Sequence, residues 1–265
     1  MTSSSHIGAS ATWPSFQTIN PTGTAPLLLL CDHASNAVPD EYDGLGLDPE
    51  TLGRHIAYDI GAKWVTEHLA RLLDSPAIFH GASRLLIDPN RTLDDPTSIC
   101  AISDGAVIPG NRSISGAERA RRADRYFHPY HREIDAVLNG FASRSIEPPV
   151  VAIHSYNPIY KGVERPWHIG VLWMHENAVA RGLIDYFDRE PQCTVGDNAP
   201  YDARNGHGYT IETHVEPRGL PNALIEIRND LIATEEGATL WAERLAGALA
   251  AVLPRLAAVN EDQVA

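Results

Sequence analysis

The sequence predicts a layered α/β domain whose central sheet is mostly buried. Two observations lead to this class: short apolar runs of strand length alternate with longer segments of helical periodicity, and the runs are apolar throughout rather than at every second residue. Strands covered by helices on both faces have this composition. The 265 residues suffice for one core, so we predict a single domain over 26–258, between a flexible leader (1–25) and a frayed tail (259–265).

Six apolar runs are predicted to form the strands. Each is short and is bounded by polar residues, glycine or proline, as is typical of strands that end in turns. The runs are 27–31, 77–80, 85–87, 149–153, 168–173 and 223–227.

Four segments with helical periodicity are predicted to form the helices. The first follows Asp48 as N-cap, with Pro49 at the first helical position, and the second follows Ser115, with Glu118 three residues later. The segments are 49–73, 117–141, 178–188 and 235–253.

The composition excludes several classes of protein. A formal net charge of −13 argues against nucleic-acid binding, which depends on basic side chains that neutralise phosphates. No apolar stretch approaches the roughly 20 residues that span a bilayer, and the first residues lack a secretory signal, so we expect a cytoplasmic protein without a membrane partner. The three cysteines are widely spaced, which predicts neither disulfides nor a cysteine-based zinc site. No feature indicates a particular oligomeric state.

Polar side chains gather directly after four of the apolar runs, in the segments CDHASN, DPNR, HSYNP and RNDL. In an open α/β sheet, ligands bind beyond the carboxyl ends of the strands, so these segments are expected to meet in space. The long segments 92–114 and 198–221 lack periodicity, and loops of that length in a compact domain are usually functional. We therefore predict an active site at this edge of the sheet, with the two segments as walls of its pocket.

A metal site is one interpretation of these clusters. His33 and His154 each follow an apolar run closely, and Asp59 is a third candidate on or near the first predicted helix. Two histidines and one carboxylate, with water in the fourth position, make a catalytic zinc site. Two alternatives stay open: both histidines merely hydrogen-bond at strand ends, or His55, four residues before Asp59 on the same helix face, is the ligand that Asp59 orients.

Glu226 is the candidate general base. In the segment IEIRND, Glu226 and Arg228 share one face of a predicted strand, and the two isoleucines share the other. A glutamate beside a metal-bound water can take a proton from it and return the proton to a leaving amine. The alternative is a structural ion pair between Glu226 and Arg228.

Two arginines near the predicted pocket indicate an anionic substrate. Arg84 and Arg91 bracket the apolar core of SRLLIDPNR, and arginine is suited to bidentate binding of a carboxylate. The alternative is that Asp88 and Arg91 pair to fix the turn around Pro89. For Asp88 this structural interpretation is preferred.

Three further residues are candidates to contact the substrate. Asn36, three residues after His33, lacks a carboxylate's charge and is expected to position other groups. Ser155 follows His154 in the HSYNP segment. His207 lies in the glycine-flanked loop NGHGYT, which either presents this side chain to the substrate or is a plain surface loop.

Six motifs, DHASNAVP, YDIGA, SRLLIDPNR, HSYNP, GHGYT and LIEIRNDL, occur in this order. As a set they resemble the N-formylglutamate amidohydrolases, and the resemblance covers residues 27–253. That family is similar in fold to the zinc carboxypeptidases and aspartoacylases. The resemblance therefore implies a three-layer α/β/α sandwich with a mixed central sheet.

The resemblance also implies a reaction and a set of site residues. The reaction is zinc-dependent hydrolysis of N-formyl-L-glutamate, a small anionic N-acyl amino acid, to glutamate and formate in histidine degradation. The chain departs from the His-x-x-Glu motif of the carboxypeptidase-like relatives, because Asn36 stands in the place of the glutamate. The residues that match by motif are His33, Asp59 and His154 for one zinc ion, Glu226 as the base, and Arg84, Asn90 and Arg91 for the substrate.

Two other functions stay open. A metallocarboxypeptidase, or a deacylase for another N-acyl compound, would share the site and differ in substrate. A non-catalytic carboxylate-binding protein would keep the pocket without the metal. Substrate preference separates the first from the leading interpretation, and zinc content separates the second.

Overall fold

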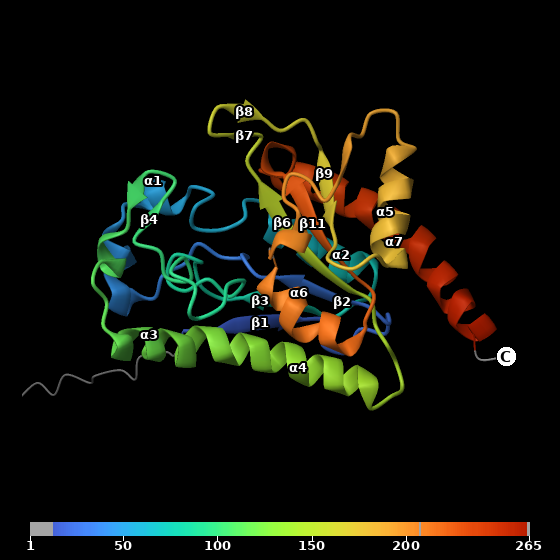
Figure 1. Ribbon diagram of the computed structural model, residues 1–265, viewed down its shortest axis with the longest axis horizontal. Helices are drawn as coiled ribbons and strands as arrows, with labels where there is room; N and C mark the ends of the chain where they lie inside the picture. Colours follow the sequence, from blue (N-terminus) through green and yellow to red (C-terminus); the bar gives the residue numbers. More distant parts are fainter. Residues whose placement is uncertain (1–12, 207, 264–265) are drawn as a thin grey trace, which may run out of the picture.

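A seven-stranded mixed sheet forms the centre of the protein (Figure 1). The computed structural model describes residues 13–206 and 208–263. In spatial order the strands are β1 (Phe16–Ile19), β3 (Ala77–His80), β2 (Leu28–Cys31), β6 (Val150–Tyr156), β11 (Asn222–Arg228), β9 (Ile169–Leu172) and β10 (Val195–Asp197). The four strands from β3 to β11 are parallel, whereas β1 and β9 run antiparallel to their inner neighbours and β10 is parallel to β9.

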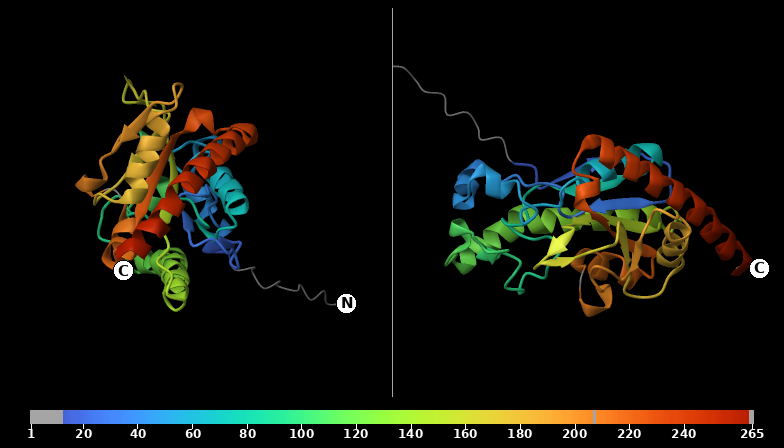
Figure 2. Two further views of the ribbon diagram at one scale, coloured as in Figure 1. Left: turned by 90° about the vertical axis from the view of Figure 1, so that its right-hand side faces the viewer. Right: turned by 90° about the horizontal axis from the view of Figure 1, so that it is seen from above.

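Helices cover both faces of this sheet. On one face α2 and α7 pack side by side (Figure 2), and α5 packs against α7. On the other face α4 and α6 enclose a separate core cluster. The helices are α2 (Ala62–Leu72), α5 (Ala178–Asp188) and α7 (Glu235–Gln263) on the first face, and α4 (His128–Ala142) and α6 (Tyr209–His214) on the second.

The residues of β2 show why its sequence is apolar at every position. Leu29 and Cys31 belong to the core cluster under α2, α5 and α7, and Leu28 and Leu30 belong to the cluster under α4 and α6. Removing one leucine side chain from water contributes about 1.5–3 kcal/mol, and here both faces of the strand contribute. The predicted α/β/α sandwich with a mixed, mostly buried sheet is confirmed.

Two short hairpins lie outside the central sheet. One consists of β4 (Ile102–Ser103) and β5 (Ala106–Val107), within the predicted pocket segment 92–114. The other consists of β7 (Ile159–Tyr160) and β8 (Val163–Glu164), and it projects beyond the carboxyl end of β6 (Figure 1).

Five of the six predicted strands are confirmed as β2, β3, β6, β9 and β11. The sixth, at 85–87, is wrong. These residues are buried, but they form a turn in which the N–H of Leu86 donates to the carbonyl of Ser83, 2.9 Å away. Their side chains join a third core cluster under the long loops. A short apolar run that fills such a cluster has the same composition as a buried strand.

The predicted helix 49–73 is wrong between residues 53 and 61. It consists of two helices, α1 (Pro49–Leu52) and α2, and the second begins only after Gly61. The segment 117–141 is helical throughout, as α3 (Gly116–Arg122), a π-helical turn (Ala123–Phe127) and α4. The π-helical turn lies just before Pro129, which has no N–H to donate in an α-helical hydrogen bond. The predicted helix 178–188 coincides with α5.

Part of the predicted flexible leader, residues 1–25, belongs to the central sheet. Residues 16–19 form β1, an edge strand that pairs antiparallel with β3, so the leader prediction is wrong for them. Phe16 and Ile19 pack against the two core clusters, and so short a pattern is not distinctive in sequence. At the other end α7 extends from the predicted helix 235–253 through residue 263. Residues 1–12 and 264–265 lie outside the described residues.

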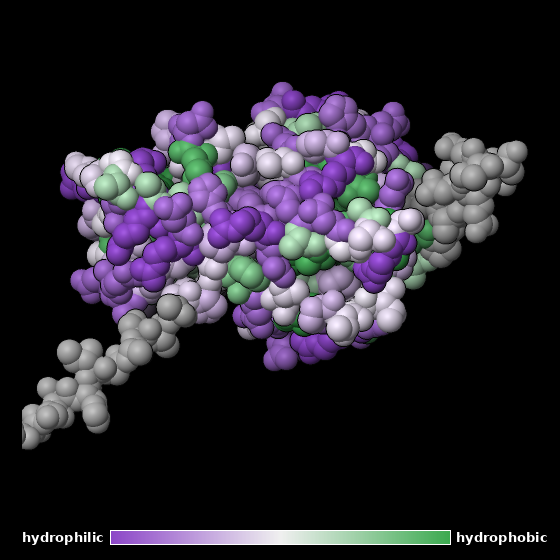
Figure 3. Space-filling view, turned by 90° about the horizontal axis from the view of Figure 1, so that it is seen from below, coloured by the Kyte–Doolittle hydropathy of each residue, from purple (hydrophilic) through white to green (hydrophobic). Residues whose placement is uncertain are grey.

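No helix within the described part of the chain is long and apolar enough to cross a membrane. Figure 3 shows one face of the molecule, on which hydrophilic residues predominate and hydrophobic residues are scattered between them.

Gly61 is a position where a side chain would both strain the backbone and clash with main chain. Its φ is +80°, and a Cβ there would lie 2.0 Å from the carbonyl oxygen of Ile232. We expect Gly61→Ala to lower the free energy of unfolding by at least about 3 kcal/mol, because the backbone strain adds to a clash with main chain. Urea unfolding measures the change.

Gly162→Ala is the matched control, because Gly162 has a φ of +79° and no atom within 4 Å of the added Cβ. We expect it to lower the free energy of unfolding by about 1 kcal/mol, from backbone strain alone. Equal effects of the two substitutions would contradict a specific role for the close approach between Gly61 and Ile232.

Candidate active site

A cavity of about 750 Å³ opens at the carboxyl ends of the parallel strands. Its wall includes His33 after β2, Arg84 after β3, His154 on β6 and Glu226 on β11. The predicted pocket segments contribute as well, with residues 102–105 from one and Tyr201 from the other. The prediction that the polar clusters meet at this edge of the sheet is confirmed for CDHASN, DPNR and HSYNP, whereas no residue of RNDL lines the cavity.

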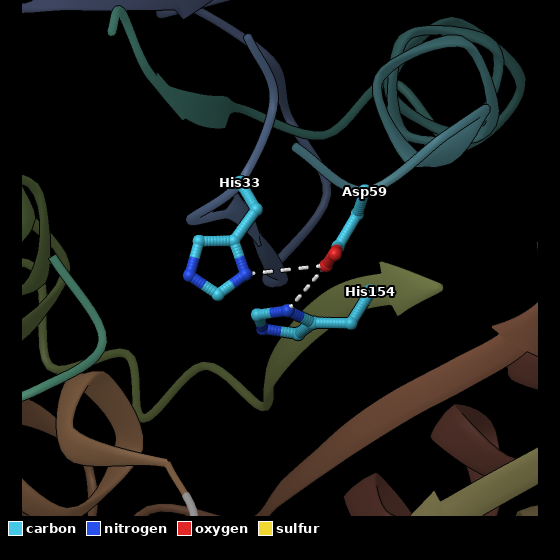
Figure 4. A group of neighbouring side chains, drawn as sticks. All are labelled: His33, Asp59 and His154. Carbon is cyan, nitrogen blue, oxygen red and sulfur yellow. Dashed lines mark hydrogen bonds and ion pairs between the residues drawn. The ribbon is translucent and has the colours of Figure 1, made fainter. Parts of the chain in front are cut away.

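His33, Asp59 and His154 converge at the floor of this cavity (Figure 4). Oδ2 of Asp59 lies 3.3 Å from Nδ1 of His33 and 2.8 Å from Nδ1 of His154. All three side chains are buried. The backbone N–H of Asp59 donates to the carbonyl of His33 at 2.9 Å, which holds the segment before α2 against the end of β2. Three groups that can ligate a metal therefore face one point.

The far nitrogens of both imidazoles are held by further carboxylates. Nε2 of His33 lies 2.9 Å from Oδ1 of Asp88, and Nε2 of His154 lies 3.1 Å from Oδ2 of Asp32. Metal-binding histidines are commonly oriented in this way by a carboxylate on the nitrogen away from the metal. The structure therefore contains both the ligand set and the groups that would orient it.

Arg84 determines the tautomer of His33. Its Nη1 lies 3.2 Å from Nδ1 of His33, and a guanidinium can only donate. His33 therefore accepts at Nδ1 and carries its proton on Nε2, where it donates to Asp88. This tautomer leaves the Nδ1 lone pair directed at the centre of the cluster, as a metal ligand requires.

Burial and charge act against each other on the cluster. Burial alone would raise the pKa of Asp59, but the charge of Arg84 and the hydrogen bond with His154 outweigh it and hold that pKa well below its usual range. Burial alone would lower the pKa of His154, but hydrogen bonds with Asp32 and Asp59 raise it well above the ordinary value. The cluster thus attracts positive charge. Protons supply this charge in the metal-free protein, and a metal cation would supply it in the metal-bound protein.

His55 is not equivalent to Asp59 in this arrangement. It lies before α2 rather than on one helix face with Asp59, and its Nδ1 is 3.7 Å from Oδ1 of Asp59. Burial, assisted by the charge of Arg84, lowers the pKa of His55 to about 4. Asp59, and not His55, lies between the two imidazoles.

Glu226 is the immediate neighbour of His154 across the parallel pair β6 and β11. Its Oε2 is buried and has no hydrogen-bond partner among the described residues. Burial raises the pKa of Glu226 to about 8, although the charge of His154 opposes the rise. The alternative of a Glu226–Arg228 pair is wrong, because Arg228 pairs with Asp230 at 2.8 Å.

The chain matches a known family over most of its length. Residues 25–233 match the family model described as N-formylglutamate amidohydrolase. The chain belongs to this family. The resemblance of the motifs is thereby confirmed, and the N-formylglutamate amidohydrolase family is one of enzymes.

Two solved structures are similar to this member of the N-formylglutamate amidohydrolase family. A gene product of Agrobacterium tumefaciens has 32% sequence identity and a TM-score of 0.88, with 91% of this chain and 95% of that chain covered. An N-formylglutamate amidohydrolase from Ralstonia eutropha has 22% identity and a TM-score of 0.68, with 88% and 97% covered. No curated protein matches the chain significantly.

Arg84, Asn90 and Arg91, which are predicted to bind the substrate of this N-formylglutamate amidohydrolase family member, all line the cavity. Arg84 pairs with Asp59 and donates to the carbonyl of His55 at 2.8 Å, so it lies on the floor beside the cluster. Oδ1 of Asn90 accepts from the N–H of Thr210 at 3.0 Å. Arg91 forms no ion pair with a carboxylate of residues 13–206 and 208–263.

The other three candidates differ in position. Ser155 lies on the wall, and its hydroxyl donates to the carbonyl of Ile60 at 2.9 Å, which ties the Asp59 segment to β6. Asn36 is not on the wall, because its amide donates to the carbonyl of Leu52 at 3.0 Å. His207 lies outside the described residues.

The sequence does not reveal what Asp32, Asp88 and Arg165 contact. The predicted pairing of Asp88 with Arg91 is wrong, because Asp88 pairs with His33 while also accepting from the N–H of Asn90 at 2.8 Å. Asp32 and Arg165 were not singled out. For Asp32 and Asp88 the signal was available, because each is the first polar residue after an apolar run that leads to the cavity.

The raised pKa of Glu226 gives a stability test in protein freed of metal by a chelator. Its value of about 8 lies above that of an exposed glutamate, about 4.3, so the folded protein binds the extra proton between these values. Stability from this group is therefore full below about pH 4 and is lost as the pH rises through 8. We expect Glu226→Gln to raise the Tm relative to wild type near pH 8.5 and not near pH 4.5.

The control is Glu236→Gln, which removes an exposed carboxylate on α7 and is expected to leave the Tm difference near zero at both pH values. Calorimetry on the three proteins measures the effect. A Tm gain for Glu226→Gln that does not change with pH would contradict the assignment.

Proposed function

We propose that this chain is a zinc-dependent amidohydrolase that cleaves N-formyl-L-glutamate, or a similar N-acyl acidic amino acid, to the free amino acid and formate. The observation that supports the proposal best is the orientation of the two imidazoles. Each has Nε2 held by one carboxylate and Nδ1 directed at Asp59, and these three groups form a buried set that could hold a metal ion. Two imidazole nitrogens and one carboxylate are a ligand set of catalytic zinc.

The chain's own residues account for the proton transfers of such a reaction. A bound zinc ion would lower the pKa of a water molecule toward neutrality and polarise the formyl carbonyl. Glu226, with Oε2 unpartnered beside His154, would take the proton from the attacking water and return it to the departing nitrogen. Arg84, beside the cluster, would stabilise negative charge that develops on the carbonyl oxygen.

The cavity suits an acidic substrate. Arg91 lines it without an ion pair in the described part of the chain, so its guanidinium is available to a substrate carboxylate. Membership of the N-formylglutamate amidohydrolase family supports N-formyl-L-glutamate as the substrate, with formyl as the acyl group and glutamate as the amino acid. The same membership leads us to propose that the enzyme acts in the cytoplasm, in histidine degradation.

A deacylase for a larger N-acyl substrate is the second candidate. The observation in its favour is the cavity volume of about 750 Å³, which falls in the range of sites that enclose drug-sized ligands. Relative kcat/KM values for N-formyl-, N-acetyl- and N-butyryl-L-glutamate decide between the two candidates.

Glu226→Gln tests the reaction and the base together. We expect the wild type to hold one zinc ion per chain and to release formate from N-formyl-L-glutamate, and the variant to retain zinc while kcat falls by at least about 100-fold. Elemental analysis and a formate assay measure the two quantities, and Glu236→Gln, exposed on α7, is the control. Full activity of Glu226→Gln would overturn the role of the base, and a wild type that binds no zinc would overturn the metal site.

Asp88→Asn tests the orienting carboxylate. Asp88 accepts from Nε2 of His33, and loss of such a partner typically weakens metal binding by about 10–100-fold. We expect Asp88→Asn to lower the affinity for zinc by this factor, and Asp94→Asn, whose side chain is exposed, to leave the affinity unchanged. A competition titration with a chelator measures both affinities. Equal zinc affinities of the two variants would show that His33 does not need this partner.

A further inference from the structure

Arg165 is a buried cation without an acidic partner. The residue is 9% exposed, and it forms no ion pair with a carboxylate of residues 13–206 and 208–263. By contrast Arg122, which is also buried, pairs with Glu118 at 3.0 Å. A buried charge is unfavourable unless a hydrogen-bonded counter-charge compensates it. Arg165 therefore has no counter-charge in direct contact within the described residues, although its charge opposes the rise in the pKa of Glu226.

Three tyrosines hold the guanidinium of Arg165 in one orientation. Its Cζ lies 4.7 Å from the ring centroid of Tyr160, 4.8 Å from that of Tyr201 and 5.6 Å from that of Tyr156. Nη1 donates to the hydroxyl of Tyr201 at 3.1 Å. Such cation–π contacts keep the planar group in place without neutralising its charge. The nitrogens Nε and Nη2 form no hydrogen bond within residues 13–206 and 208–263, so their donors are available to another partner.

The open side of Arg165 faces the active-site cavity. Arg165 directly follows β8, and its backbone N–H donates to the carbonyl of Pro158 at 2.8 Å, which fixes the base of the hairpin that projects beyond β6 (Figure 1). The residue lines the same cavity as Arg91 and Glu226. The cavity thus contains two arginines without ion pairs in the described residues, one after β3 and one after β8.

We infer that Arg165 recognises the side-chain carboxylate of the substrate and so selects an N-acyl amino acid with two carboxylates. This inference rests on the proposed function and names the residue that makes glutamate preferred over a neutral amino acid of the same size. Arg91 would take one carboxylate and Arg165 the other. A planar, caged guanidinium with unused donors on both Nε and Nη2 among the described residues fits the bidentate geometry that a carboxylate offers.

The test compares N-formyl-L-glutamate with N-formyl-L-glutamine, which has the same shape and lacks the charge. A hydrogen bond to a charged group contributes about 10- to 150-fold in binding. We expect Arg165→Met to lower kcat/KM for N-formyl-L-glutamate about 30- to 100-fold, chiefly through KM, and that for N-formyl-L-glutamine less than about 3-fold. Arg132→Met, which removes an exposed cation on α4 away from the cavity wall, should leave the ratio of the two substrates unchanged.

Equal losses for both substrates would overturn the inference, because they would show that Arg165 only supports the fold of the cavity. Arg165→Lys guards against a folding defect in the methionine variant, since it keeps the charge and loses the planar fork. We expect it to retain about a tenth of the preference for N-formyl-L-glutamate. A lysine variant with the full wild-type preference would contradict bidentate recognition.

Binding of glutarate separates this inference from the proposed reaction. Calorimetry with the zinc-loaded protein should show that Arg165→Met and Arg165→Lys both weaken glutarate binding and change the binding of its monoamide little. If the wild type released formate from no N-formyl amino acid and this pattern still held, the proposed reaction would fail and the role of Arg165 would stand. If the wild type released formate and the variants kept its preference for glutamate over glutamine, the inference alone would fail.

Discussion

The interaction on which the site depends is the buried contact of Asp59 with the imidazoles of His33 and His154. A carboxylate that is 2% exposed is unfavourable in isolation, and here two imidazoles and the guanidinium of Arg84 surround it. The backbone reinforces this position. The N–H of Asp59 donates to His33, and the hydroxyl of Ser155 donates to Ile60, so the segment before α2 is tied to both β2 and β6.

The parallel arrangement of β3, β2, β6 and β11 brings the remaining groups to the same place. Parallel strands end at one edge of the sheet, and helices on both faces keep that sheet dry. Glu226 and His154 are direct neighbours on β11 and β6, so the candidate base and a candidate ligand are positioned by regular backbone rather than by loops. A site on such strands is held more rigidly than one carried by loops alone.

The cavity of this acidic protein is lined by arginines as well as by carboxylates. The chain has a formal net charge of −13, yet Arg84, Arg91 and Arg165 all line the cavity. Arg84 compensates Asp59, whereas the other two form no ion pairs among the described residues. An anionic ligand responds to the field inside a low-dielectric cleft more than to distant surface charges, which are screened by salt. Arg91 and Arg165 are therefore the groups through which the cavity would bind a carboxylate in spite of the acidic surface.

The sequence by itself determined the α/β class, most of the strands and the positions of His33, His154 and Glu226. These residues lie on or directly after apolar strands, and the periodicity of a strand is a local property of the chain. The tertiary structure alone decided how Asp59 is placed. The amphipathic pattern continues through residues 53–61, but the helix begins only after Gly61, which has a φ of +80° and lies against Ile232, far away in the sequence.

The same reason explains why the partners of the two imidazoles and the setting of Arg165 were not predictable. Asp32, Asp88 and Arg165 are ordinary polar residues in the sequence. Their roles follow from the side chains that they contact in the folded protein. The partner of a buried polar group is chosen by long-range packing, which brings together strands, turns and a hairpin that are separated by tens of residues.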